Sequence, residues 1–223
     1  MTSTIFAKTG LETLLTPDNC VLMLIDHQPF QAAAVKNIDV GTMINNTVSL
    51  AKTAKAFGVP TLLTSVLRDR GGLIFKQITD VFPEQTPIDR TFINTWEDEN
   101  CVSWVQKTGR KKIVIAARWT EVCLAFPVIH ALGDGYEVYF VTDASGGTSV
   151  EAHEMGIARM IQAGAVPLTS GVWLNCSVIG PEPTALQKLP RSSSTTVVQL
   201  APALLGSCNC LPDRITHRSP CGR

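Results

Sequence analysis

The stretch KIVIAARWTEVCLAFPVIHAL, residues 112–132, decides the fold. Its first six residues, Lys112–Ala117, form a short apolar run that is typical of a buried strand. From Thr120 to Leu132 the pattern favours a helix, and Thr120 is a residue type that often caps a helix start. A buried strand that leads directly into a helix is the repeating unit of an α/β protein.

The same alternation continues on both sides of this stretch. Strands are predicted over 21–26, 60–66, 88–89, 136–142 and 166–169, and helices over 41–57, 97–107 and 149–163. A long polar loop is expected over 68–87, with one helical turn near 75–79. Strands separated by helices need crossover connections, so we predict a three-layer α/β fold with a mostly parallel central sheet and helices on both faces.

Composition excludes several classes of function. Of 223 residues, 45% are hydrophobic, and 19 Lys and Arg balance 19 Asp and Glu. Such a balance argues against a nucleic-acid partner, which requires a basic surface. No apolar run approaches the roughly 20 residues that cross a bilayer, and the N-terminus lacks the apolar stretch of a signal peptide. Seven scattered cysteines do not form a disulfide framework, so we expect a cytoplasmic, reducing location and no membrane association.

The composition changes near residue 177. The last 47 residues hold six of the 13 prolines, three of the seven cysteines and the run SSSTT. They show no helical or strand period beyond a weak apolar stretch over 197–205. We therefore predict one folded domain over 1–176 and a poorly ordered Ser/Pro/Cys-rich tail over 177–223.

Three polar residues follow predicted strands and are candidates for chemistry, because ligands of open α/β sheets bind beyond the carboxyl ends of the strands. They are Asp26, Arg90 and Cys123. If the Thr120 hydroxyl caps the helix, Cys123 lies in its first turn, where the helix dipole favours a thiolate. Burial of Asp26 would raise its pKa toward that of a useful base. A carboxylate, a cation and a thiol suit covalent acyl transfer.

Structural interpretations stand beside these functional ones. Cys123 lies among apolar residues and could be a small buried side chain. Asp26 could instead cap its own turn, and Arg90 could be a solvated surface charge. No Cys or His pair has zinc spacing, the DASGGTS segment over 143–149 lacks a nucleotide-binding fingerprint, and no GxSxG elbow nominates a serine. We therefore expect no metal and no cofactor.

The chain resembles the isochorismatase-like cysteine hydrolases, and it looks closest to the YcaC branch of that family. The resemblance is carried by the stretch quoted above and by VLMLIDHQ (21–28), DRTFINTWEDENC (89–101), VTDASGGT (141–148) and ARMIQAGAVPLTS (158–170). It covers about residues 15–176. It implies a Rossmann-like fold, hydrolysis of an amide or ester through a cysteine, and a symmetric homo-oligomer.

The resemblance also implies roles for individual residues. Cys123 would be the nucleophile, Asp26 the general base and Arg90 the third catalytic residue. A non-proline cis peptide would join Arg118 to Trp119. Its purpose would be to direct the Trp119 backbone N–H, together with that of Cys123, at a substrate oxyanion.

This chain also departs from the family pattern. Most members carry lysine at the position of Arg90, and small residues where this chain has Arg118 and Trp119. These two bulky side chains are expected to narrow or reshape the substrate pocket. The metal-binding Asp and His pattern of nicotinamidases is absent from 68–83. Candidate pocket residues are Phe30, Asn94, Trp96 and Arg118, although Asn94 and Trp96 could equally serve structure.

The resulting hypothesis is a cysteine hydrolase that cleaves a small amide, carbamoyl or related acyl substrate through a thioester. One alternative is isochorismatase-type hydrolysis of a vinyl ether, which needs the acid and the cation but no thiol. Another is a catalytically inactive protein that binds a ligand or serves in assembly.

Overall fold

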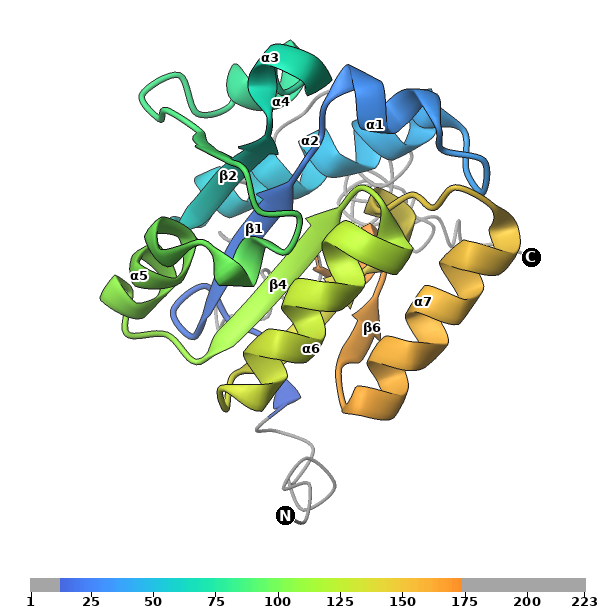
Figure 1. Cartoon of the computed structure of the whole chain (residues 1–223). Coiled ribbons are helices and arrows are strands. Elements are labelled where there is room, and N and C mark those ends of the chain that lie inside the picture. Colours follow the sequence, from blue (N-terminus) through green and yellow to red (C-terminus); the bar gives the residue numbers. More distant parts are fainter. Residues whose placement is uncertain (1–12, 174–223) are drawn as a thin grey trace, which may run out of the picture.

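A single six-stranded sheet forms the centre of the molecule (Figure 1). The computed structural model describes residues 13–173. All strands are parallel, in the order β3-β2-β1-β4-β5-β6. Their bounds are β1 Cys20–Ile25, β2 Thr61–Val66, β3 Ile88–Arg90, β4 Lys112–Ala117, β5 Glu137–Val141 and β6 Val166–Leu168.

The two central strands, β1 and β4, are buried along their whole length. Their residues alternate between two apolar clusters, so that Leu22 and Leu24 face one side of the sheet and Val21 and Met23 the other. This double burial explains why both strands are continuous apolar runs rather than alternating ones. In register, Ile25 lies opposite Ala117, which brings the carboxyl ends of the two strands together.

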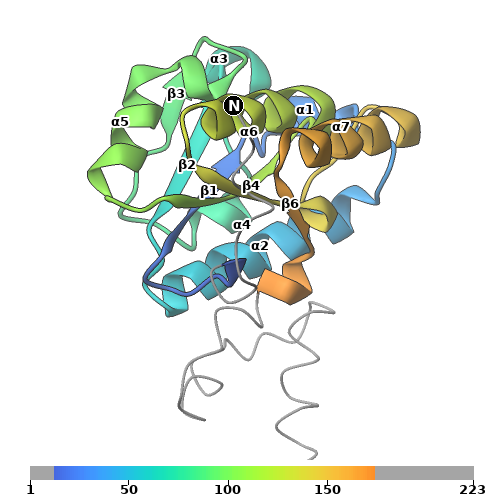
Figure 2. The same cartoon turned by 90° about the horizontal axis from the view of Figure 1, so that it is seen from below.

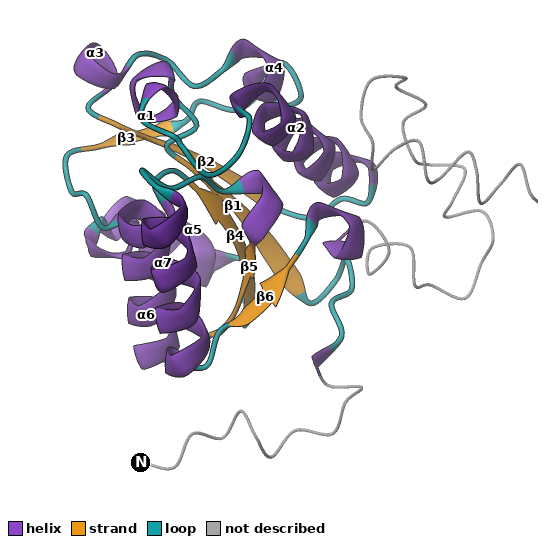
Figure 3. Cartoon of the chain, turned by 90° about the vertical axis from the view of Figure 1, so that its right-hand side faces the viewer, coloured by secondary structure: helices purple, strands orange, loops and turns teal. Residues whose placement is uncertain are grey.

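Helices cover both faces of the sheet, as the views from below and from the side show (Figures 2 and 3). On one face lie α2 (Val40–Ala56) and α4 (Lys76–Thr79), and on the other α5 (Glu99–Lys107), α6 (Ala125–Gly133) and α7 (Val150–Ala163). The predicted α/β class and three-layer arrangement are therefore confirmed.

Several short elements were not predicted from the sequence. They are α1 (Pro29–Ala33), α3 (Arg68–Gly71) and the 3₁₀ turns η3 (Thr95–Glu97) and η5 (Thr142–Ala144). The predicted helix over 120–132 is divided, since it starts as one wide π-type turn, η4 (Thr120–Leu124), before α6 begins. A single turn of four or five residues has too few positions to show a period.

The prediction for residues 177–223 lies outside the described residues. Within 13–173, no helix is both long and apolar enough to span a bilayer.

Candidate active site

The strand order reverses between β1 and β4, and two of the three candidate residues follow these two strands. Asp26 comes directly after β1, and Cys123 lies on η4 after β4. Arg90 is the last residue of β3, two strands away from β1 in the sheet. In doubly wound sheets a crevice forms at such a reversal, so this placement is where a ligand site is expected.

Asp26 and Arg90 form a buried ion pair. Arg90 Nη2 donates to Asp26 Oδ2 over 2.6 Å, and both side chains are fully shielded from solvent. Arg90 Nη1 also donates to the backbone carbonyls of Phe92 and Ile93. The guanidinium is thus held by its neighbours on the chain while it contacts the carboxylate. A buried, paired cation excludes the interpretation of Arg90 as a solvated surface charge.

The backbone at Asp26 leaves the strand through a left-handed conformation, with φ of 58°. Aspartate tolerates this region better than most residues. Its N–H still donates to Thr64 O on β2 over 3.0 Å, and its own carbonyl accepts from Gln28 N–H over 2.7 Å. Asp26 therefore ends β1 and begins a tight turn, in which its side chain is directed at Arg90 rather than used as a cap.

Cys123 lies next to the carboxyl group of Asp26. Cys123 is 5% exposed, and its thiol lies close enough to the Asp26 carboxyl group for each side chain to shift the pKa of the other. The pKa of Asp26 is raised from 3.8 to about 6, chiefly by burial, and the charge of Arg90 limits the rise. At neutral pH the carboxyl group is therefore ionised but poised to accept a proton.

The expectation that Cys123 is a thiolate at rest is wrong. Its thiol pKa is raised to about 12, first by burial and then by the negative charge of Asp26. A backbone hydrogen bond from Trp119 and the charge of Arg90 lower the pKa, but not enough to compensate. The resting pair is consequently a thiol beside a carboxylate. Cys123 needs Asp26 to remove its proton, because a helix dipole alone does not supply enough stabilisation.

The expected Thr120 cap is also absent. The Thr120 hydroxyl is 2.8 Å from His153 Nδ1 on α7, and no side chain caps the start of η4. The turn is closed by its backbone instead, because the N–H groups of Val122 and Leu124 both donate to Trp119 O. Thr120 thus fixes η4 to α7 rather than capping its own helix.

The predicted cis peptide between Arg118 and Trp119 is confirmed. The Trp119 indole Nε1 donates to Gln31 O on α1 over 2.8 Å, and its ring lies 6.5 Å from that of Phe30. Phe30 is 62% exposed. Of the four predicted pocket residues, Phe30 thus has its ring beside Trp119, which immediately precedes the Cys123 turn.

The side chains of Asn94 and Trp96 form hydrogen bonds with residues other than the three candidates. Asn94 Oδ1 accepts from Trp96 N–H, and its amide nitrogen is within reach of Glu97 and His130. The Trp96 indole donates to Asp134, just after α6, over 2.8 Å. Both side chains have structural partners, and their role in a substrate pocket stays a prediction.

The Arg118 side chain is fully buried and packs against Phe75. Its guanidinium lies 5.1 Å from the centre of the Phe75 ring, and Phe75 packs against the apolar cluster on the α2 face. Cys123 belongs to the cluster on the α5–α6–α7 face. The Arg118 guanidinium thus lies beside a residue of the α2-face cluster, and its predicted effect on the shape of the substrate pocket stays a prediction.

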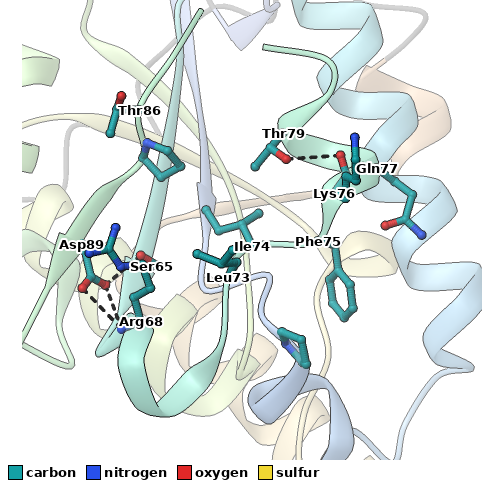
Figure 4. A pocket seen from close by; sticks show the side chains of 12 residues that line it. Ser65, Arg68, Leu73, Ile74, Phe75, Lys76, Gln77, Thr79, Thr86 and Asp89 are labelled. Atoms are coloured by element: carbon teal, nitrogen blue, oxygen red, sulfur yellow. Dashed lines mark hydrogen bonds between the residues drawn. The ribbon is translucent and has the colours of Figure 1, made fainter. Parts of the chain in front are cut away.

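A groove of about 630 Å³ lies on the α4 side of β2 and β3 (Figure 4). Its lining does not include the three candidate residues. Its walls are mainly apolar, and they are formed by Pro29, Ser65, Arg68, Leu73, Ile74, Phe75, Lys76, Gln77, Thr79, Thr86, Pro87 and Asp89.

Sequence analysis missed two residues that support the site. Gln28 accepts from Val66 N–H and donates to Val66 O and Gly72 O, which ties the turn after β1 to the end of β2. His27 is fully buried, with Nε2 3.2 Å from Ala116 O on β4. The sequence signal that could have identified His27 and Gln28 was their position directly after Asp26. Over residues 13–173, no group of three or more His, Cys, Asp and Glu is arranged to hold a metal ion.

Comparison with known proteins identifies the family. The isochorismatase domain family matches residues 20–171. YcaC of Escherichia coli (strain K12), a probable hydrolase, is 35% identical over 157 residues, which cover 70% of this chain and 76% of YcaC.

Two solved structures agree with that match. The crystal structure of E. coli YcaC, an octameric hydrolase of unknown specificity, has a TM-score of 0.80 at 30% identity and covers 90% of this chain and 98% of its own. The structure of YcaC from Pseudomonas aeruginosa, with hexane-2,5-diol and covalent acrylamide, has a TM-score of 0.77 at 28% identity. The match covers 88% of this chain and 98% of the P. aeruginosa chain. The chain therefore belongs to the isochorismatase family and, within it, to the YcaC branch.

Proposed function

We propose that the protein is a cysteine hydrolase that cleaves small amides, carbamoyl compounds or related acyl substrates. The observation that carries the proposal is the position of the Asp26 carboxylate between the Cys123 thiol and the Arg90 guanidinium. A base with a pKa of about 6 is ionised at neutral pH and can still return a proton to a leaving group.

In the first half of the reaction, Asp26 takes the thiol proton as Cys123 sulfur attacks the carbonyl carbon. A C–S bond forms and the carbonyl oxygen becomes an oxyanion. The backbone N–H groups of Trp119 and Cys123 hold this oxyanion, and one such donor contributes about 2.7–4 kcal/mol in comparable sites. Support comes from the Trp119 backbone, whose interaction with the Cys123 sulfur lowers the pKa of the thiol.

Collapse of this intermediate breaks the bond to the leaving group, which takes the proton from Asp26. Water then attacks the thioester while Asp26 accepts a proton from it. The C–S bond breaks, the acid is released and the proton returns to sulfur. Arg90 stays protonated throughout, because a guanidinium does not exchange protons near neutral pH, and it limits the pKa of Asp26 by its charge.

The test is hydrolysis of a panel of small amides and carbamoyl compounds by wild type, Cys123→Ala and Cys123→Ser. The proposal predicts that both variants lose at least about a thousandfold in kcat/KM, since the covalent step is removed. Cys101→Ala is the matched control, because Cys101 is also buried but lies on α5, and it is expected to retain activity. Full activity of Cys123→Ser on a vinyl ether would instead favour isochorismatase-type hydrolysis.

We further propose that the chain forms a homo-oligomer. E. coli YcaC is octameric, and this chain exposes large apolar side chains near the Asp26–Arg90 pair. Phe92 and Ile93 are 50% and 59% exposed, although the backbone carbonyls of both residues accept hydrogen bonds from Arg90. Phe30 is also exposed, and its ring lies beside that of Trp119. Clustered exposed apolar residues mark interaction surfaces.

A further inference from the structure

Arg118 presents a buried guanidinium without hydrogen-bond partners. The side chain is fully shielded from solvent, and Nε, Nη1 and Nη2 all lack an acceptor among the described residues. Its one ring contact is the face of Phe75, at 5.1 Å. The five N–H donors of the guanidinium are thus buried, and no described residue accepts a hydrogen bond from them.

No carboxylate among residues 13–173 forms an ion pair with this guanidinium. Burial is the cause that lowers the pKa of Arg118, to about 10. The titratable group facing it is His27, whose pKa is lowered well below its ordinary value by burial and by Arg118, so the ring is neutral. His27 Nδ1 has no partner either. Buried charges are normally paired, so an unpaired guanidinium at this position is unusual.

The groove of Figure 4 shares Phe75 with the surroundings of Arg118. Phe75 forms part of the groove wall, with Pro29 and Ile74, and its ring centre lies 5.1 Å from the Arg118 guanidinium. Phe75 is half-buried and precedes α4, where its N–H donates to His27 O. Phe75 is therefore the residue that the apolar groove and the buried cation have in common.

We propose that Arg118 and this groove form a second ligand site, distinct from the Cys123 site, for an organic carboxylate. The carboxylate accepts from the guanidinium fork, which suits two parallel N–H···O bonds. The hydrocarbon part of the ligand lies in the groove against Pro29, Leu73 and Ile74, and the Phe75 ring turns aside to join the two spaces. This proposal does not depend on the hydrolase mechanism.

The experiment measures binding of three probes by isothermal titration and by the shift of the thermal midpoint. Benzoate carries the anion and a hydrocarbon body, benzamide is its neutral isostere, and inorganic phosphate is an anion without hydrocarbon. Wild type is expected to bind benzoate saturably and at least tenfold more tightly than either benzamide or phosphate. In Arg118→Leu the benzoate affinity is expected to fall at least tenfold, while the ligand-free protein unfolds at a higher temperature because an unpaired cation has been removed.

Matched variants distinguish this site from the surface of the groove. Arg68→Gln removes an exposed cation from the groove wall and is expected to weaken benzoate binding far less than Arg118→Leu does. Arg118→Lys keeps the charge but not the fork and is expected to weaken binding. Phe75→Ala removes the ring that has to turn aside, and it is therefore expected to accelerate benzoate association.

Three results would overturn the proposal. They are equal benzoate binding by wild type and Arg118→Leu, phosphate binding as tight as that of benzoate, and loss of binding in Arg68→Gln but not in Arg118→Leu. The absence of benzoate binding by wild type would overturn it as well. Loss of amide hydrolysis in Cys123→Ala has no bearing on any of these outcomes.

Discussion

Asp26 links the charge state of the site to the stability of the fold. Residue types and strand ends were enough to predict that Asp26, Arg90 and Cys123 belong together. The order of their pKa values was not predictable, because it depends on burial and on the distance between the thiol and the carboxylate. A local argument from the helix dipole favoured a thiolate, whereas the folded environment favours a thiol.

The raised pKa of Asp26 has a stability consequence of defined sign. A carboxyl group whose folded pKa lies above its unfolded value stabilises the fold when protonated, below about pH 4, and loses that contribution as the pH rises through about 6. The shift corresponds to about 3 kcal/mol. Between pH 4 and 7.5, the unfolding free energy of wild type should fall by about this amount relative to Asp26→Asn in urea titrations. Parallel profiles of the two proteins would contradict the assignment.

Arg90 limits the pKa of Asp26, so its removal should affect both residues. Arg90→Met leaves a buried carboxylate without its cation, and at pH 7.5 this should cost about 3–5 kcal/mol of unfolding free energy. The double variant Asp26→Asn/Arg90→Met should recover most of the loss, since no buried charge remains. A double-mutant cycle by urea unfolding measures the coupling, and additive losses would show that the ion pair is unimportant.

At the scale of elements, the turn η4 is placed by the segments around it. Thr120 N–H donates to Gly146 O over 2.9 Å, and the Thr120 hydroxyl contacts His153 on α7. The sequence predicted a helix over these residues but not its wide first turn. That turn results from tertiary contacts with 146–156, which no local pattern encodes.

Gly146 should be intolerant of a side chain. A Cβ at this position would lie 2.8 Å from Met43 Sδ and from both Val35 methyl carbons, so that the backbone bonded to Thr120 would have to move. Gly146→Ala is expected to cost about 1–3 kcal/mol and to slow labelling of Cys123 by acrylamide. Gly133→Ala is the control, because a Cβ there meets no atom within 4 Å, and it should be neutral or stabilising by up to about 1 kcal/mol. Equal effects of both changes on labelling would refute this view of η4.

At the scale of the whole molecule, the parallel sheet and its two helical layers followed from the alternation of apolar runs and helical segments. The direction of the Arg118 side chain could not be predicted in this way, because a residue just beyond a strand can direct its side chain to either face of a sheet. Tail order and cytoplasmic location stay predictions.

The proposed oligomer gives a prediction at this scale. Ile93→Asp places a charge in the exposed apolar cluster and should lower the molar mass measured by sedimentation equilibrium. Lys107→Asp, an exposed change at the end of α5, should leave the mass unchanged. A wild-type chain that sediments as a monomer would refute the assembly without affecting the chemistry of Cys123.

The central claim is that Asp26 activates a neutral Cys123 thiol, and the pH profile of covalent labelling tests it most directly. Acrylamide is a suitable probe because P. aeruginosa YcaC has been seen with it bound covalently. Peptide mass spectrometry should find the adduct on Cys123, with a labelling rate that rises through pH 6 and then levels off. In Asp26→Asn the rate at neutral pH should fall at least about tenfold and lose the midpoint near pH 6. A wild-type rate that rises only above pH 8, as for an unassisted thiol, or that is unchanged in Asp26→Asn, would contradict the account.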